Sequence, residues 1–247
     1  MATMATIKSG IPGLDDLFGE KKEFPKGRQV LISGPPGSGK TVFGLQFLIN
    51  GALHSDEPGI FISFDDLPRH IRTDMLSFGW NVRQLEEEFN PPLITMVDGF
   101  SARVGLSTDE KFTIRANLDS LLIVLTEILE ETGATRVCID SLSTLSTIIK
   151  DPAQVRKEIL TMGAILGEQG CTTFLTAESL EGGVEEYSSQ GLIRLSYDEL
   201  PTGEFRRSIL IQKMRGFAHD FSWKEFRITS EGIKIFPERT VGRVHLK

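Results

Sequence analysis

The sequence predicts an α/β fold: a mostly parallel central sheet flanked by helices, with antiparallel strands at its C-terminal end. Two observations lead to this prediction. As far as Ala177, short apolar runs alternate with segments whose apolar residues recur at helical spacing, which is typical of parallel strands joined by helices on both faces. After Ala177, strand-like runs are separated only by turns, which is typical of antiparallel pairing.

The parallel strands are expected where continuous apolar runs of strand length occur, at residues 29–33, 59–64, 93–97, 136–140 and 171–177. Helices are expected between them at residues 41–50, 69–78, 80–88, 108–132 and 152–168. Pro68 and Pro152 suit helix starts, because a first-turn residue needs no N–H partner. Gly133 suits the end of the longest helix.

The C-terminal part is expected to form strands at residues 191–197 and 207–212, joined by a turn at 201–204. A final hairpin is expected at 226–236, around Glu231 and Gly232. The N-terminus is read as a disordered tail at 1–6 and a turn-rich segment at 7–18. Without a linker or a shift in composition, residues 1–247 are expected to form a single domain.

Composition and charge exclude several classes of protein. The chain is 40% hydrophobic and 25% charged, which is ordinary for a globular protein, and its net charge is −7. An acidic chain without a long basic run is not an unspecific binder of nucleic acid or anionic membranes. No apolar run approaches the roughly eighteen residues of a membrane span. Cys138 and Cys171 lie in apolar runs and are read as reduced, buried thiols, so we expect a cytoplasmic protein.

The strongest chemical signal is a phosphate-binding loop of the pattern G-x-x-x-x-G-K-[ST], placed between an expected strand and an expected helix. Its residues are Gly34, Pro35, Pro36, Gly37, Ser38, Gly39, Lys40 and Thr41. The glycines let the backbone turn tightly and direct N–H groups at phosphate oxygens. Lys40 suits the β- and γ-phosphates of ATP, and the Thr41 hydroxyl suits the Mg²⁺ ion between them. We therefore expect ATP or ADP with Mg²⁺ as cofactors.

Acidic residues follow two of the expected strands. Asp140 follows Val137, Cys138 and Ile139, where a carboxylate can order the magnesium shell. Asp65 and Asp66 follow another strand that should end at the same edge of the sheet, so either can orient or deprotonate the attacking water. Capping of the next helix is an equally good reading of this aspartate pair.

Lys213 and Arg215 are separated by one residue, so on a strand both project from the same face. Such a pair can deliver charge to a phosphate group. An exposed basic face of a strand is the simpler reading. An arginine supplied by a neighbouring subunit, however, commonly stabilises phosphoryl transfer.

These motifs together resemble the single-domain KaiC-like ATPases of the RecA superfamily over nearly the whole chain. The resemblance rests on SGIPGLDDLF at residues 9–18, GPPGSGKT at 34–41, FISFDD at 61–66, FGW at 78–80, VCIDSLS at 137–143 and KMRGFAHD at 213–220. The last motif is the most specific, since the phosphate loop and the strand with its aspartate recur in many unrelated NTPases.

The resemblance implies a RecA-like P-loop fold and homo-oligomeric rings, usually hexamers, with ATP held between adjacent subunits. It implies that Lys40 and Thr41 bind phosphate and magnesium and that Asp140 belongs to the magnesium shell. It also implies that Lys213 and Arg215 reach the nucleotide of the neighbouring subunit, which replaces the simpler reading of this pair.

The chain departs from the family pattern at the end of the second strand, where the family usually has two glutamates and this chain has Asp65 and Asp66. An aspartate carboxylate is withdrawn by about 1.5 Å, the length of one C–C bond. A misplacement near 1 Å can lower a rate on the order of a hundredfold, so we expect slow hydrolysis. Gln190 also stands where most relatives would have an aspartate, and the sequence does not explain the consequence. No second phosphate loop is present, so clock phosphorylation is not carried over.

Three functions fit these observations. The leading hypothesis is an ATP-binding, slowly hydrolysing ring ATPase that acts as a nucleotide-dependent switch toward an unidentified protein partner. An alternative is a scaffold subunit that binds ATP without hydrolysing it, similar to archaellum-assembly subunits. A recombinase-like DNA-binding ATPase is a further alternative, disfavoured by the acidic charge.

Overall fold

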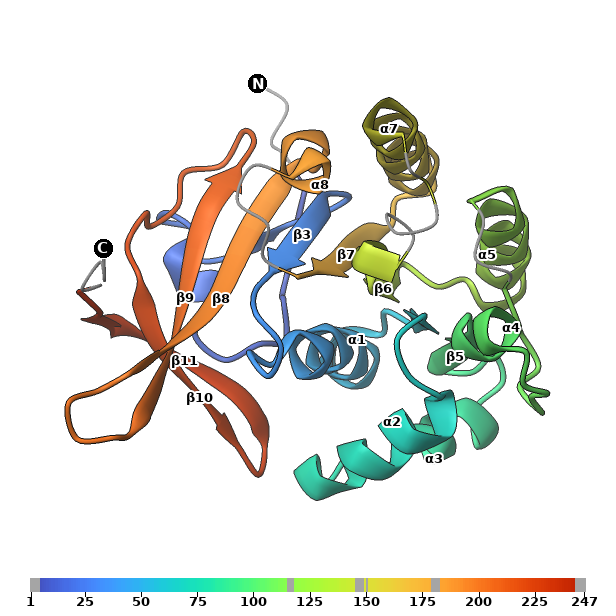
Figure 1. Cartoon of the computed structure of the whole chain (residues 1–247), viewed down its shortest axis with the longest axis horizontal. Helices are drawn as coiled ribbons and strands as arrows, with labels where there is room; N and C mark the ends of the chain where they lie inside the picture. The colour runs from blue at the N-terminus through green and yellow to red at the C-terminus, as the bar shows by residue number, and fades with distance from the viewer. Residues whose placement is uncertain (1–4, 115–117, 145–148, 150, 179–182, 243–247) are drawn as a thin grey trace.

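The computed structural model describes residues 5–114, 118–144, 149, 151–178 and 183–242, and these residues build a sheet of nine strands (Figure 1). Six strands are parallel, in the spatial order β8 (Gly191–Glu199), β3 (Gln29–Ser33), β7 (Thr172–Ala177), β6 (Arg136–Asp140), β4 (Gly59–Ser63) and β5 (Ile94–Asp98). Beyond β8 the sheet continues with antiparallel strands β9 (Phe205–Met214), β10 (Lys224–Thr229) and β11 (Gly232–Thr240). The predicted parallel sheet with antiparallel C-terminal strands is confirmed.

The central strands are buried along their whole length, which is why their sequences are continuous apolar runs. Every residue of β3, β4, β5, β6 and β7 is buried. Strands covered on both faces have no solvent side and therefore no alternation of polar residues. In contrast, β8 loses its cover near its end, where Tyr197 and Glu199 are exposed and Asp198 is only partly buried.

Helices cover both faces of the sheet, as predicted. On one face, α1 (Lys40–Ser55), α2 (Pro68–Met75) and α3 (Val82–Glu87) pack on a core that contains Val30 and Ile32. On the other face, α5 (Leu118–Thr132) and α7 (Pro152–Glu168) pack on a core that contains Leu31. This alternation along β3 is the two-residue period of a strand. Within the described residues, no helix is both long and apolar enough to cross a membrane.

Close packing brings α1 against the sheet just behind the phosphate loop. The rings of Phe47 and Phe174 stack with centroids 4.0 Å apart. Gly44 faces Cys138, and a Cβ atom at this glycine would lie 2.4 Å from the cysteine Sγ. Cys138 and Cys171 are free, buried thiols, as predicted. The helix that carries Lys40 therefore has a fixed position on the sheet.

Two predicted helix boundaries are wrong. Helix α1 continues beyond residue 50 to Ser55, where the left-handed Asp56 ends it by bonding its N–H to the Gly51 carbonyl. The segment expected to be helical from residue 108 is not helical as far as Ile114, and the described helix begins at Leu118. Here Asp98 N–H donates to the Phe112 carbonyl and Ile114 N–H donates to the Asp98 carbonyl. These bonds to the end of β5 replace the helical ones.

The N-terminal segment forms a small sheet in which β1 (Thr6–Ile7) pairs with β2 (Phe24–Pro25). The expectation of a tail over residues 1–6 is therefore wrong at Thr6, and residues 1–4 lie outside the described part of the chain. Arg136 anchors the segment that follows β1. Its buried guanidinium donates to the carbonyls of Lys8, Ser9 and Phe47 and pairs with Glu57.

The remaining described elements are short and connect the layers. They are the 3₁₀ turns η1 (Asp15–Leu17) and η2 (Leu76–Phe78) and the helices α4 (Phe100–Val104) and α8 (Val184–Ser188).

Candidate functional site

The predicted phosphate loop joins β3 to α1, at the carboxyl edge of the parallel strands. Gly37 and Gly39 have φ angles of 76° and 101°, which are left-handed conformations that favour glycine. A Cβ atom at Gly34 would lie 2.5 Å from the Leu195 carbonyl oxygen. All three glycines therefore stand where the backbone requires them, two for conformation and one for close approach to β8.

The polar groups of the loop point to an anionic ligand. The Lys40 ammonium donates to the carbonyls of Gly34 and Pro35, at 2.9 and 3.1 Å. The buried Ser38 hydroxyl has no hydrogen-bond partner among the described residues. Burial lowers the pKa of Lys40, although the nearby carboxylates of Asp140, Glu178 and Asp65 oppose this effect. A ligand with phosphate oxygens would satisfy both the lysine and the serine.

Thr41 and Asp140 come together as a candidate magnesium pair. The Thr41 hydroxyl donates to Asp140 Oδ2 at 2.7 Å, and the Thr176 hydroxyl donates to Oδ1. Burial raises the pKa of Asp140, whereas these two hydroxyl groups and Lys40 act in the opposite direction. Hydroxyl and carboxylate oxygens are the donors that Mg²⁺ prefers. Among the described residues, no group of three or more His, Cys, Asp or Glu side chains could hold a metal ion by itself, so phosphate oxygens and water would complete this shell.

The two candidate catalytic aspartates have different surroundings. Asp65 Oδ2 accepts a hydrogen bond from the Ser141 hydroxyl at 2.6 Å, and Oδ1 accepts one from the Thr144 hydroxyl. Both hydroxyls belong to the segment that follows Asp140. Asp65 is therefore held at the end of β6, beside the candidate magnesium pair.

Asp66 contacts the start of the next helix instead. Its Oδ1 accepts the Leu67 N–H at 2.7 Å and lies 2.9 Å from His70 Nδ1 in the first turn of α2. Its backbone is fixed by the Ser63 hydroxyl, which donates to the Asp66 carbonyl. Asp66 therefore lies one residue before the N-cap residue Leu67 and does not itself cap α2, so the capping prediction is wrong in detail, while Asp65 lies beside the candidate magnesium pair.

An open pocket of about 610 Å³ brings five of the predicted site residues together. Its polar wall contains Lys40, Thr41, Asp65, Asp66 and Asp140. Its other wall is formed by α2 and η2 and is mixed: Ile71, Met75 and Phe78 are apolar, and Thr73, Asp74 and Ser77 are polar. The pocket is large enough for the phosphate end of a nucleotide and for groups brought by a second molecule.

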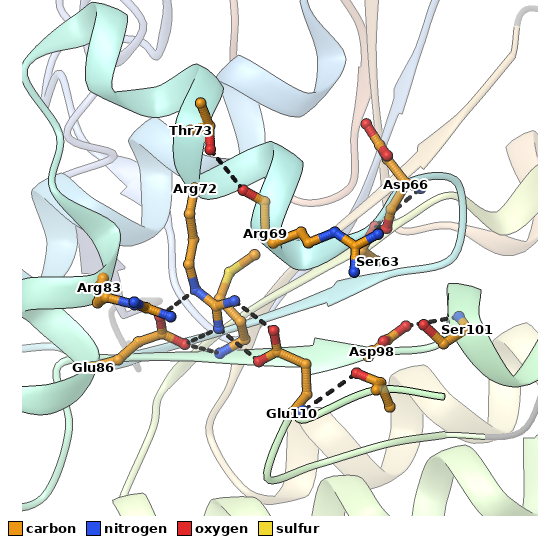
Figure 2. A network of polar contacts seen from close by, with 12 residues as sticks. Ser63, Asp66, Arg69, Arg72, Thr73, Arg83, Glu86, Asp98, Ser101 and Glu110 are labelled. Atoms are coloured by element: carbon orange, nitrogen blue, oxygen red, sulfur yellow. Dashed lines mark hydrogen bonds and ion pairs between the residues drawn. The ribbon is translucent and has the colours of Figure 1, made fainter. Parts of the chain in front are cut away.

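Helix α2 is held over this pocket by a three-residue ion network (Figure 2). Arg72 contacts Glu86 through Nε at 2.6 Å and through Nη2 at 2.8 Å, and its Nη2 also contacts Glu110 at 2.7 Å. Although burial lowers it, the pKa of Arg72 stays above its usual value because these two carboxylates accept its hydrogen bonds. The network ties α2 to α3 and to the segment before Ile114.

Lys213 and Arg215 lie away from this pocket. The Lys213 ammonium donates to the carbonyls of Glu186 and Ser189, at 3.0 and 2.5 Å. Burial lowers the pKa of Lys213, and Arg215 acts in the same direction. Arg215 is exposed just beyond the end of β9. The structure therefore does not bring this pair to Lys40 within one chain.

The backbone shows how far apart the two groups are. Arg215 N–H donates to the Gln190 carbonyl, and Gln190 N–H donates to the Gln29 carbonyl. Gln29 begins β3, and Gly34 follows its end. About 17 Å of extended chain, the length of β3, therefore separates the level of Arg215 from the level of the phosphate loop. Gln190, whose role the sequence did not explain, also accepts the Gln29 N–H on its side-chain oxygen. It thus closes the start of β3 against β8.

Sequence reasoning missed Tyr197, which reaches the phosphate loop from β8. Its hydroxyl donates to the Pro36 carbonyl at 3.2 Å, and its ring contacts Phe205 edge-on at 5.9 Å. Beside it, a second open pocket of about 640 Å³ is lined by Phe205, Arg206 and Arg207 among others. The exposed end of β8 continues past the phosphate loop. A strand predicted to be longer than residues 191–197 would have indicated that Tyr197 lies beside this loop.

Comparisons with known proteins agree with this fold and site. The profile of the KaiC ATPase family matches residues 7–240. A UPF0273 protein of Pyrococcus furiosus is 38% identical over 247 residues, which cover 96% of this chain and 96% of that protein. A UPF0273 protein of Thermotoga maritima is 38% identical over 240 residues, with coverages of 94% and 96%.

Among solved structures, a KaiC-like protein of Pyrococcus horikoshii matches with a TM-score of 0.80 and 33% sequence identity. The match covers 95% of this chain and 100% of the archaeal one. From the parallel sheet, the phosphate loop at its edge and these relatives, we conclude that the chain belongs to the KaiC-like ATPases of the RecA superfamily.

Proposed function

We propose that the protein binds ATP with Mg²⁺, hydrolyses it slowly and acts as a nucleotide-dependent switch. The single observation that carries this proposal is the geometry of residues 34–41. Left-handed glycines shape the loop, the buried Ser38 hydroxyl is unpartnered among the described residues, and Lys40 bonds only to carbonyls of the loop. A bound triphosphate would supply what each of these groups lacks.

Within this proposal each residue has a defined task. Lys40 exchanges its loop carbonyls for phosphate oxygens, and Thr41 and Asp140, which now share a hydrogen bond of 2.7 Å, would hold the magnesium ion. When bound, Mg²⁺ supplies neutralisation of the charge on the phosphates. Asp65 orients the attacking water from its place beside Asp140. Because both of its oxygens also accept hydroxyl groups, its motion is restricted, which favours slow turnover.

We further propose that the site is completed by a neighbouring copy in a ring, with the nucleotide at the interface. Lys213 and Arg215 lie near the start of β3, whereas Lys40 lies beyond its end. If they contact a nucleotide, it is therefore the one bound by another copy. A head-to-tail contact of this kind closes into a ring when the rotation between copies is suitable. A hexamer is the assembly that we expect, in the cytoplasm.

A second candidate is a scaffold subunit that holds ATP without hydrolysing it. The observation that favours it is the engagement of both Asp65 oxygens by Ser141 and Thr144. If these bonds persist with nucleotide bound, the two hydroxyls compete with the attacking water for the Asp65 carboxylate.

Nucleotide retention tests the proposal. The purified chain is mixed with ATP and Mg²⁺, free nucleotide is removed, and the retained molecule and the assembly mass are read by native mass spectrometry. We expect bound ATP or ADP in the wild type, none in Lys40→Ala, and full retention in Lys21→Ala, which removes an exposed lysine from the N-terminal segment. Failure of the wild type to retain nucleotide, or equal retention by Lys40→Ala, would contradict the proposal.

A further inference from the structure

The outer face of the β10–β11 hairpin is largely polar, and its register is regular from Glu225 to Thr229, with a shift between Lys224 and Glu225. Phe236 lies opposite Glu225, and Lys234 lies opposite Arg227. The residues that alternate with them, such as Ile235, point into the core under the sheet. Because paired residues share a face, these four side chains stand together on the side of the hairpin that faces away from the core.

Three cations on this face surround one aromatic ring. Arg227 Cζ lies 5.6 Å from the centroid of Phe236, Lys234 Nζ lies at 5.8 Å and Arg239 Cζ at 4.3 Å. The arginine side chains are 62% and 46% exposed. We call Arg227, Lys234, Phe236 and Arg239 the hairpin cation cluster.

Carboxylates do not balance the cluster. One oxygen of Glu225 serves both Arg227, at 2.9 Å, and Arg239, at 3.3 Å. Glu238 adds a longer and well exposed contact to Arg239 at 3.6 Å. Lys234 makes no ion pair with another described residue. On a chain with a net charge of −7, this surface therefore keeps unused capacity to bind carboxylates.

The cluster lies at the edge of the sheet. Strand β11 is outermost and pairs only with β10 among the described strands. Figure 1 shows the hairpin projecting away from α5 and α7. An outermost strand offers backbone N–H and C=O groups to an extended peptide, although Pro237 removes one donor.

The buried side of the same hairpin touches the helix of the phosphate loop. The Gln46 side chain of α1 accepts the Ile233 N–H at 2.6 Å and donates to the Ile233 carbonyl at 3.0 Å. Gly39, where α1 begins, faces Ile228, and a Cβ atom at this glycine would lie 2.9 Å from the Ile228 Cδ1. A shift of α1 on nucleotide binding would therefore be transmitted to the hairpin.

We propose that the hairpin cation cluster is a docking site for an extended acidic segment of a partner protein. An acidic peptide is favoured over nucleic acid for two reasons. The Phe236 ring is already covered by cations and is not free to stack on a base, and the outermost strand β11 offers backbone groups that an extended peptide can pair with. The second part of this proposal is that nucleotide binding changes the affinity of the docking site, and this part rests on the proposed function.

The test uses a fluorescein-labelled oligoglutamate peptide and the full chain, with binding followed by fluorescence anisotropy. We expect binding that weakens as NaCl rises. The double variant Lys234→Glu/Arg239→Glu should bind about tenfold more weakly or worse, because like charges then face each other. The control Arg156→Glu/Lys157→Glu, on the exposed side of α7, changes net charge equally and should bind as the wild type does.

The docking site would be overturned by a lack of peptide binding, by an equal loss of binding in the control variant, or by tighter binding of oligothymidylate than of the peptide. A changed assembly mass in the Lys234→Glu/Arg239→Glu variant would also overturn it, because it would show that the face lies between copies. The nucleotide response is judged separately. ATP with Mg²⁺ should change the affinity of the wild type and not that of Lys40→Ala. Wild-type chain that retains nucleotide but shows no such change would overturn the response alone, whereas chain that retains none would contradict the proposed function.

Discussion

At the scale of single residues, the neighbouring aspartates Asp65 and Asp66 have different hydrogen-bond partners. Asp65 is held by the hydroxyls of Ser141 and Thr144 at the end of β6, while Asp66 contacts Leu67 and His70 at the start of α2. Only Asp65 has a fixed place beside the magnesium pair. The residue type alone gave both aspartates equal standing, and their hydrogen-bond partners separate them.

We therefore expect Asp65→Asn to remove most of the remaining ATP hydrolysis, on the order of a hundredfold, because it removes the carboxylate that orients water. Asp66→Asn should leave the rate within a few-fold of the wild type. Asp65→Glu should raise the rate, since it restores the missing methylene. Single-turnover phosphate release measures all of these, with nucleotide affinity as the control for binding. A larger loss in Asp66→Asn than in Asp65→Asn would reverse the assignment.

At the scale of elements, the position of α2 depends on a charged network rather than on a large apolar face. Its residues Ile71 and Met75 reach the core, whereas Arg72 joins it to α3 through Glu86 and to a neighbouring segment through Glu110. The three side chains are only 14 to 18% exposed. Removing the arginine would leave two carboxylates close together with little solvent.

Arg72→Met should accordingly lower the free energy of unfolding by about 3 kcal/mol or more, since it leaves partly buried charges uncompensated. The control is Arg83→Met on α3. Its arginine is 70% exposed and pairs with Glu87 at 3.4 Å. That variant should change stability by less than about 1 kcal/mol. Urea unfolding followed by circular dichroism compares the two, and equal losses would show that the network does not support α2.

At the scale of the whole molecule, the two halves of the proposed site lie at opposite ends of the parallel strands of one sheet. The phosphate loop follows the end of β3, and Arg215 lies level with its start. No rotation of side chains brings these groups together in one copy. The proposed activity therefore requires an ordered contact between copies.

Mixing two inactive variants tests this requirement. Lys40→Ala and Arg215→Ala should each be inactive alone. If they are unfolded and refolded together, roughly a quarter of the junctions in a ring join an intact loop to an intact arginine, so part of the ATPase rate should return. Phosphate release from the mixture measures the recovery. Full activity of Arg215→Ala alone, or a mixture that stays inactive although its rings are mixed, would refute the shared site.

Much of the site was predictable because its signals are local. The loop Gly34 to Thr41, the strand before it and Asp140 each depend on a few consecutive residues, and the structure places them together. The end of α1 was not predictable, because it depends on a left-handed Asp56, a conformation that residues other than glycine rarely adopt. The segment around Phe112 was not predictable, because bonds to backbone that is distant in sequence decide its structure. The contacts of Tyr197 and Gln46 were not predicted either, because their partners Pro36 and Ile233 lie far away in sequence.

The anchoring of the N-terminal segment by Arg136 sets a lower limit on how short a working form of this chain can be. Two of its guanidinium hydrogen bonds end on the carbonyls of Lys8 and Ser9. A truncated polypeptide that began at Gly10 would leave the buried Arg136 guanidinium with fewer hydrogen-bond acceptors. Trimming or tagging for expression is thus best placed before Thr6, where β1 begins.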